Sequence, residues 1–142
     1  KDLPPHSARG ENLGLLRFDA EGAKVFLTQA DALIQGGHEP AWVTEAVLTE
    51  VGNVLARSHR AEAAAFIERC YATANIQVVP VDTPLFHRAL DLYKRRADKA
   101  WGLTDCLSFV VMQDNGLVDA LTADEHFQQA GFRALLRQET DG

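Results

Sequence analysis

The chain has 142 residues and a formal net charge of −6, because 14 Lys and Arg face 20 Asp and Glu. An apolar share of 46% and a charged share of 24% are typical of one globular domain and exclude a disordered or fibrous chain. The longest apolar run, 63–67, is far shorter than the roughly 20 residues of a membrane helix. The acidic balance argues against binding nucleic acid through bulk positive charge, but it leaves room for a local basic patch.

The apolar pattern alternates between strand and helix. Residues 1–12 are polar and predict a flexible N-terminal arm, with the domain itself at 13–142. The elements expected in chain order are a strand at 13–18, a helix at 22–35, a strand at 41–44, helices at 45–57 and 61–72, a strand at 76–81, helices at 82–96 and 104–114, a strand at 117–122, a short helix at 124–130 and a strand at 132–135. Few hairpin signals occur, so we expect a parallel sheet covered by helices on both faces.

Cys70 and Cys106 are the two cysteines, and neither has a second Cys or a His at zinc-finger spacing. We interpret them as buried, reduced thiols of a cytoplasmic protein. No charged segment followed by an apolar one is visible at the start of the chain, so no secretory signal is predicted.

Acidic side chains follow the predicted strands. Asp19 follows the first, Glu45 the second, Asp82 the third and Asp124 the fourth. In a parallel sheet, ligands bind beyond the carboxyl ends of the strands. The edge where a site is expected is therefore acidic.

Three carboxylates are candidates for chemistry. Glu50 flanks the apolar stripe of its helix, Asp105 lies in the first turn of a buried helix, and Asp124 follows a strand. Clustered carboxylates repel each other and persist when a cation lies between them. Oxygen ligands without Cys or paired His favour Mg²⁺ or Mn²⁺. Each residue also has a simpler interpretation, Glu50 as a solvated side chain and the two aspartates as helix caps.

Three segments at 47–53, 103–109 and 121–127 (VLTEVGN, LTDCLSF and LTADEHF) carry a family resemblance. In this order and at these gaps, the chain from 42 to 136 resembles a PIN domain of the VapC-type toxin ribonucleases. The resemblance implies one three-layer α/β/α domain with a central, mostly parallel five-stranded sheet. It also implies a metal-dependent endoribonuclease, the toxin of a toxin–antitoxin pair, with RNA as substrate, a small antitoxin as partner, and a homodimer.

The resemblance implies a set of site residues as well. The catalytic and metal-binding carboxylates are Asp19, Glu50, Asp105 and Asp124, surrounded by Asn53, Thr104, Ser108 and Thr122. For Ser108 and Thr122 a packing or capping role is an equal alternative. The candidate RNA contacts are Lys94, Arg95, Arg96, Lys99 and His126. We call the four residues Lys94, Arg95, Arg96 and Lys99 the basic cluster. Alternatively, this cluster is a solvated helix end and His126 is a surface histidine.

The family's first strand ends in an Asp followed by Thr or Ser, and this pattern is missing. Asp19, only 31 residues before Glu50, is the nearest candidate. Three explanations are open: Asp19 substitutes across a shortened connection, the site has degenerated, or the N-terminus is truncated or altered. The alternative function is accordingly a catalytically impaired PIN-like scaffold that acts as a binding or dimerisation module.

Overall fold

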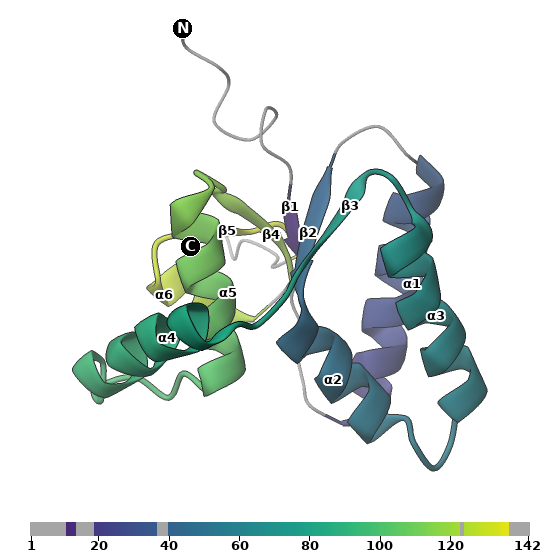
Figure 1. Ribbon diagram of the computed structural model, residues 1–142, viewed down its shortest axis with the longest axis horizontal. Coiled ribbons are helices and arrows are strands. Elements are labelled where there is room, and N and C mark those ends of the chain that lie inside the picture. The colour runs from purple at the N-terminus through teal and green to yellow at the C-terminus, as the bar shows by residue number, and fades with distance from the viewer. Residues whose placement is uncertain (1–10, 14–18, 37–39, 123, 137–142) are drawn as a thin grey trace, which may run out of the picture.

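The computed structural model describes residues 11–13, 19–36, 40–122 and 124–136 (Figure 1). Within these ranges the helices are α1 (Ala20–Gly36), α2 (Glu45–Val54), α3 (Arg60–Ala72), α4 (Thr83–Arg95), α5 (Leu103–Asp114) and α6 (Glu125–Gln129). The strands are β1 (Glu11–Leu13), β2 (Ala41–Thr44), β3 (Ile76–Val79), β4 (Asp119–Leu121) and β5 (Arg133–Ala134). None of the described helices is long and apolar enough to cross a membrane.

The five strands form one sheet in the order β3-β2-β1-β4-β5, and each neighbouring pair is parallel. β1 lies in the middle, where Asn12 is opposite Trp42 on one side and Ala120 on the other. Parallel neighbours need crossover connections, which the helices supply. The expectation of a single α/β domain with a central parallel sheet is confirmed, and the described residues form five strands of that sheet.

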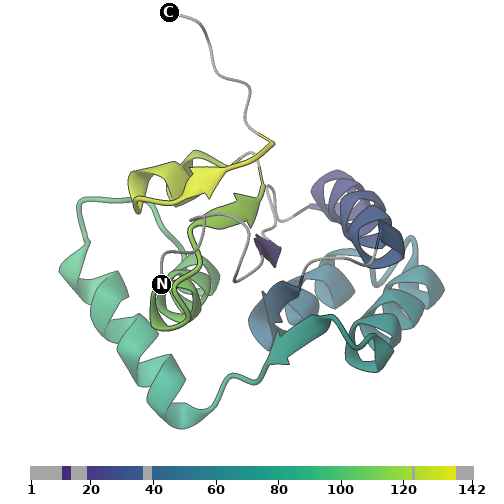
Figure 2. The same ribbon diagram turned by 90° about the horizontal axis from the view of Figure 1, so that it is seen from above.

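Helices cover both faces of this sheet. α1, α2 and α3 lie on one face, and α4 and α5 lie on the other (Figures 1 and 2). The side chains of β2 alternate accordingly, since Ala41 and Val43 belong to the core beneath α1–α3, whereas Trp42 packs against the core beneath α4 and α5. A strand buried on both faces carries apolar residues at successive positions, and this explains the continuous apolar run of β2.

An aromatic cluster holds the second core together. Phe109 is fully buried on α5, and its ring centroid lies 5.0 Å from that of Trp101 and 4.9 Å from that of Phe127, both edge to face. Phe132 packs at 5.6 Å from the same ring. Such pairs add to the free energy gained by burying their surface. Phe109 therefore fixes α6 and the segment before α5 to the body of α5.

The helix boundaries follow from local capping. Thr44 Oγ1 accepts a hydrogen bond from the backbone N–H of Val47 at 3.3 Å and starts α2. Asp82 Oδ1 accepts from the N–H of Leu85 at 2.9 Å, and Pro84 occupies the first turn of α4. The predicted elements from residue 41 onward all exist, with ends that differ by three residues or fewer.

The first strand differs from the sequence-based expectation. β1 begins at Glu11, and residues 14–18 of the expected strand lie outside the described residues. The expected boundary between arm and domain at 12/13 is also different, because Glu11 and Asn12 already pair in the sheet. Asn12 is fully buried. A polar residue in a buried strand breaks the apolar pattern on which the prediction relied.

Both cysteines are free and buried. Burial raises the pKa of the Cys70 and Cys106 thiols to about 11 in each case. The predicted buried thiols are therefore confirmed, and the raised pKa values leave little reactive thiolate at neutral pH.

We expect Phe109→Ala to lower the free energy of unfolding by about 4 kcal/mol, because it removes the shared partner of three rings and leaves a cavity. Phe109→Leu should cost only about 1 kcal/mol, since it retains most of the buried volume. Urea unfolding followed by circular dichroism measures both. Equal losses for the two variants would contradict the central role of this ring.

Candidate active site

Asp105 is the buried centre of the site. It lies in the first turn of α5 with 5% of its surface exposed. Its Oδ2 accepts a hydrogen bond from the backbone N–H of Gly102 at 3.2 Å. Burial raises the pKa of the Asp105 carboxyl, and the hydrogen bonds from His126 and Gly102 oppose that shift only in part. The carboxylate is thus held where its negative charge is poorly solvated.

Asp124 is positioned by the turn that follows β4. The buried Thr122 accepts a hydrogen bond at Oγ1 from the backbone N–H of Asp124 at 3.1 Å. Asp124 caps α6, since its Oδ1 accepts from the N–H of His126 at 3.0 Å. Thr122 therefore orients the turn, and the predicted capping role of Asp124 is confirmed. One carboxylate oxygen of Asp124 lies close enough to Asp105 and His126 for the three residues to bind the same ion.

His126 joins the two carboxylates. Its Nδ1 lies 3.0 Å from Asp105 Oδ2 and 3.6 Å from Asp124 Oδ1. One ligand atom from each of the three residues lies within 4.8 Å of the others. We name Asp105, Asp124 and His126 the carboxylate–histidine cluster. Neighbouring ligands of a divalent ion at about 2.1 Å lie about 3 Å apart, so this donor set fits such an ion.

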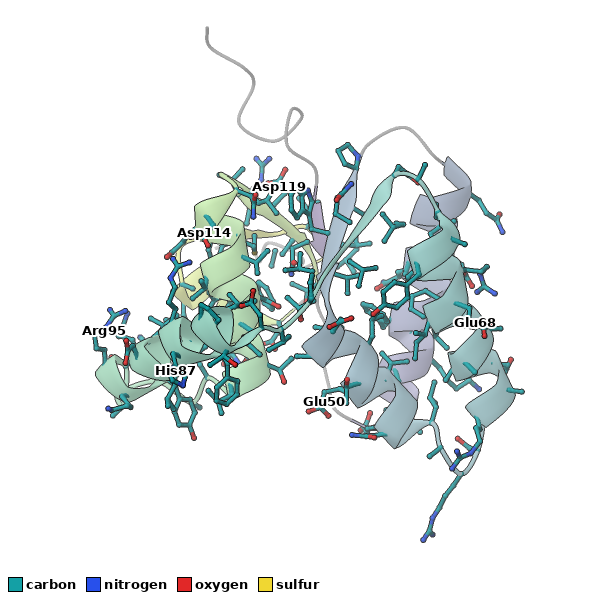
Figure 3. All side chains as sticks on the ribbon, in the orientation of Figure 1. Glu50, Glu68, His87, Arg95, Asp114 and Asp119 are labelled. Carbon is teal, nitrogen blue, oxygen red and sulfur yellow. The ribbon has the colours of Figure 1, made fainter. Side chains whose placement is uncertain are left out.

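Glu50 and Asp19 belong to no such group among the described residues. Glu50 is half-buried on α2 (Figure 3). It lines a pocket of about 400 Å³ between α2, α4 and α5. Thr104, next to Asp105 in the chain, lines the same pocket. The lining of this pocket includes none of the three cluster residues, and the expected role of Glu50 as a metal ligand stays a prediction.

Asp19 is exposed at the start of α1. Its Oδ1 accepts a hydrogen bond from the N–H of Gly22 at 2.8 Å, and its carbonyl accepts from the N–H of Ala23 at 3.0 Å. These contacts are those of a helix cap. Asp19 therefore caps α1, and its expected role as a metal ligand stays a prediction.

A family model for the PIN domain matches residues 15–133. The chain belongs to the PIN domain family. Its fold is similar to that of the solved structure of Mycobacterium tuberculosis VapC20, described as a sarcin–ricin loop cleaving toxin, with a TM-score of 0.68 and 22% sequence identity. The match covers 86% of this chain and 96% of VapC20. A comparison with curated proteins gave no match.

Other predicted site residues of this PIN domain differ in exposure. Ser108 is buried on α5, one turn after Asp105, whereas Asn53 is exposed on α2. A buried hydroxyl beside Asp105 suits a supporting role, whereas the Asn53 amide is exposed to solvent. The roles of both residues stay predictions.

The basic cluster has one member engaged locally. Arg96 donates to both carboxylate oxygens of Asp98, at 3.0 and 3.1 Å, and its guanidinium lies 5.0 Å from the centroid of the Trp101 ring. Lys94 and Arg95 are exposed in the last turn of α4, and Arg95 lies at its outer end (Figure 3). Arg96 thus stabilises the turn before α5, and Lys94 and Arg95 carry the charge presented to solvent.

Sequence reasoning missed the contacts of Glu45. Its Oε2 accepts a hydrogen bond from the Tyr71 hydroxyl at 2.5 Å, and its Oε1 accepts from the N–H of Val81 at 3.3 Å. The hydrogen bond between the Tyr71 hydroxyl and Glu45 raises the pKa of Tyr71 to about 12. Glu45 lines the same pocket as Glu50. Its position directly after β2 was the available signal, because that is where a parallel sheet collects its site residues.

The metal-free protein should gain stability from Asp105→Asn at neutral pH. The pKa of Asp105 is raised in the folded state, so the folded protein binds more protons than the unfolded chain between the ordinary and the raised pKa. The wild-type protein therefore loses stability as pH rises through that window. The amide that replaces the carboxyl does not ionise, so the Asp105→Asn variant avoids this loss. We expect a rise in Tm of a few degrees at pH 7 that disappears toward pH 4, measured in EDTA by calorimetry.

Asp114→Asn is the matched control on the same helix. Arg88 holds the pKa of Asp114 below its ordinary value through two hydrogen bonds, at 2.6 and 2.7 Å. This control should give no gain at pH 7. A Tm for Asp105→Asn that is equal to or below that of the control would contradict the account of Asp105.

Proposed function

We propose that this PIN domain is a metal-dependent endoribonuclease, and that it acts as the toxin of a toxin–antitoxin pair. The observation that carries the proposal is the convergence of Asp105, Asp124 and His126 from separate elements to within 4.8 Å. Membership of the PIN domain family supports nuclease chemistry. The fold similarity to VapC20, a toxin by its description, supports the more specific assignment.

The donor set suits Mg²⁺ or Mn²⁺. A divalent cation held by Asp105 and Asp124 would supply Lewis-acid activation of water and of the phosphodiester. Asp105 is ready to bind it, because the N–H of Gly102 fixes its carboxylate and burial leaves its charge without solvent. Asp124 is oriented by Thr122 and by the start of α6.

The neighbouring pocket offers a place for a nucleotide beside the scissile bond. Glu50, Thr49 and Thr104 give it polar atoms, and Phe86, with 39% of its surface exposed, gives it an aromatic wall. Unpaired bases are commonly stacked on such side chains in RNA recognition. Single-stranded or looped RNA is therefore the favoured substrate over a regular duplex.

The purified protein should cleave RNA in millimolar Mn²⁺ or Mg²⁺ and leave it intact in EDTA. Asp105→Asn should reduce cleavage at least a hundredfold, because it removes the buried anion that holds the cation. Asp114→Asn, at the other end of α5, should retain the wild-type rate (Figure 3). Electrophoresis of a labelled RNA measures all three. Intact RNA with every metal tested, in the absence of any antitoxin, would contradict the proposal.

The second candidate is the catalytically impaired scaffold. It is favoured by Asp19, which caps α1 and is not among the described residues that converge with Asp105. A scaffold of this kind would bind partner proteins without cleaving RNA. The cleavage assay separates the two candidates, since only the nuclease requires Asp105.

RNA attraction is assigned to the exposed part of the basic cluster. The double variant Lys94→Ala/Arg95→Ala should weaken RNA binding several-fold at 50 mM salt. It should also reduce the slope of log affinity against log salt by about 1.4 if each side chain neutralises one phosphate. The control Arg57→Ala/Arg60→Ala removes the same charge from the turn after α2 and from the first residue of α3. Fluorescence anisotropy measures the RNA affinity of both double variants. Equal losses of affinity would mean that net charge alone attracts RNA and would contradict the assignment to Lys94 and Arg95.

The remaining partners follow from the same proposal. A small antitoxin would have to neutralise an acidic site, and a homodimer is the assembly that the family resemblance implies. Size-exclusion chromatography with light scattering tests the dimer directly.

A further inference from the structure

We infer that His126 is itself a ligand of the divalent cation, through Nδ1, and that the site is a mixed oxygen–nitrogen centre that prefers Mn²⁺ to Mg²⁺. This inference rests on the proposed function. It is an alternative to the expectation that His126 contacts RNA. It gives the site a third donor from the described residues, beside Asp105 and Asp124.

The geometry of the ring carries the inference. Nδ1, rather than the outer ring nitrogen, is the atom within 3.0 Å of Asp105 Oδ2 and 3.6 Å of Asp124 Oδ1. Both separations are those of neighbouring ligands around one ion. This nitrogen is directed between two carboxylates, so any contact of the ring with RNA would have to be made by Nε2.

The ring is held in this orientation by its own helix. The N–H of His126 donates to Asp124 Oδ1 at 3.0 Å, so the backbone at the start of α6 and the carboxylate are fixed together. Phe127, the next residue, is buried against Phe109 and anchors α6 to α5. The side chain of His126 is 24% exposed. The nitrogen donor is therefore positioned before any ion arrives.

Ligation changes the role of Nδ1 without requiring another reactant. In the free site, Nδ1 and Asp105 Oδ2 share a hydrogen bond. If Nδ1 held a cation, the single proton of the neutral ring would lie on Nε2, and a proton displaced from Nδ1 would pass to solvent. Asp105 would then bind the same ion in place of its hydrogen bond with the ring.

An imidazole ligand alters metal selection. Mg²⁺ prefers oxygen donors and gives up water reluctantly, whereas Mn²⁺ accepts nitrogen more readily. Replacing His126 by Asn puts a side-chain oxygen close to the position of Nδ1. Asn therefore tests the donor type, and Ala tests the presence of a donor.

The experiment is a Mn²⁺ titration of the full chain, followed by electron paramagnetic resonance and by pulsed measurements that detect directly coordinated nitrogen. Wild-type protein should bind one Mn²⁺ with a nitrogen coupling. His126→Ala should lose the coupling and bind Mn²⁺ at least tenfold more weakly. His126→Asn should lose the coupling and show a lower ratio of Mn²⁺ to Mg²⁺ affinity. His87→Asn, an exposed histidine on α4, should behave as wild type (Figure 3).

A wild-type Mn²⁺ complex without nitrogen coupling would overturn the inference, as would a coupling that persists in His126→Ala. If such a protein still cleaves RNA in an Asp105-dependent manner, the ribonuclease proposal stands and only the ligand assignment fails. If nitrogen coupling is present but RNA stays intact, the ligand assignment holds and the nuclease proposal fails. Circular dichroism of each variant confirms that the fold is retained.

Discussion

Among the described residues, the buried carboxylate of Asp105 pairs with no Lys or Arg, and its polar contacts are the backbone N–H of Gly102 and the ring of His126. Burial raises the pKa of Asp105, and the hydrogen bonds from Gly102 and His126 compensate only partly. Nearby Asp124 adds repulsion. A buried anion of this kind costs stability unless a cation is bound. The same feature that weakens the free protein therefore prepares it to bind a divalent ion.

The fold brings these groups together through the parallel sheet. β4 ends beside the central strand β1, so the turn after β4 delivers Asp124 and His126 to the edge where α5 begins. The aromatic cluster around Phe109 then fixes α6 against α5. Asp105 and His126 are 21 residues apart in sequence, yet their side chains meet at 3.0 Å. Stability of the core and geometry of the site thus depend on the same helix, α5.

The sequence predicted the region from residue 41 onward well, because its strands are short apolar runs and its helices have clear caps such as Thr44 and Asp82. The sequence also placed Asp105 in the first turn of a buried helix and Asp124 directly after a strand, and the structure has both residues there. β1 was displaced because Asn12 is polar and buried. The contact of His126 with Asp105 depends on a ring orientation at the start of a five-residue helix, and no periodic pattern encodes such an orientation. Glu50 was placed on the correct helix, but a helix alone does not specify whether its side chain reaches the ion or the neighbouring pocket.

Glu45 and Glu50 make the pocket beside α2 acidic. Under the proposed function, a bound cation would supply the positive charge that lets RNA approach. Crystals grown with Mn²⁺ and measured at its absorption edge test this claim most directly. The account predicts one anomalous peak between the carboxylates of Asp105 and Asp124 and within bonding distance of His126 Nδ1. A peak elsewhere on the molecule, or no peak at saturating Mn²⁺, would contradict it.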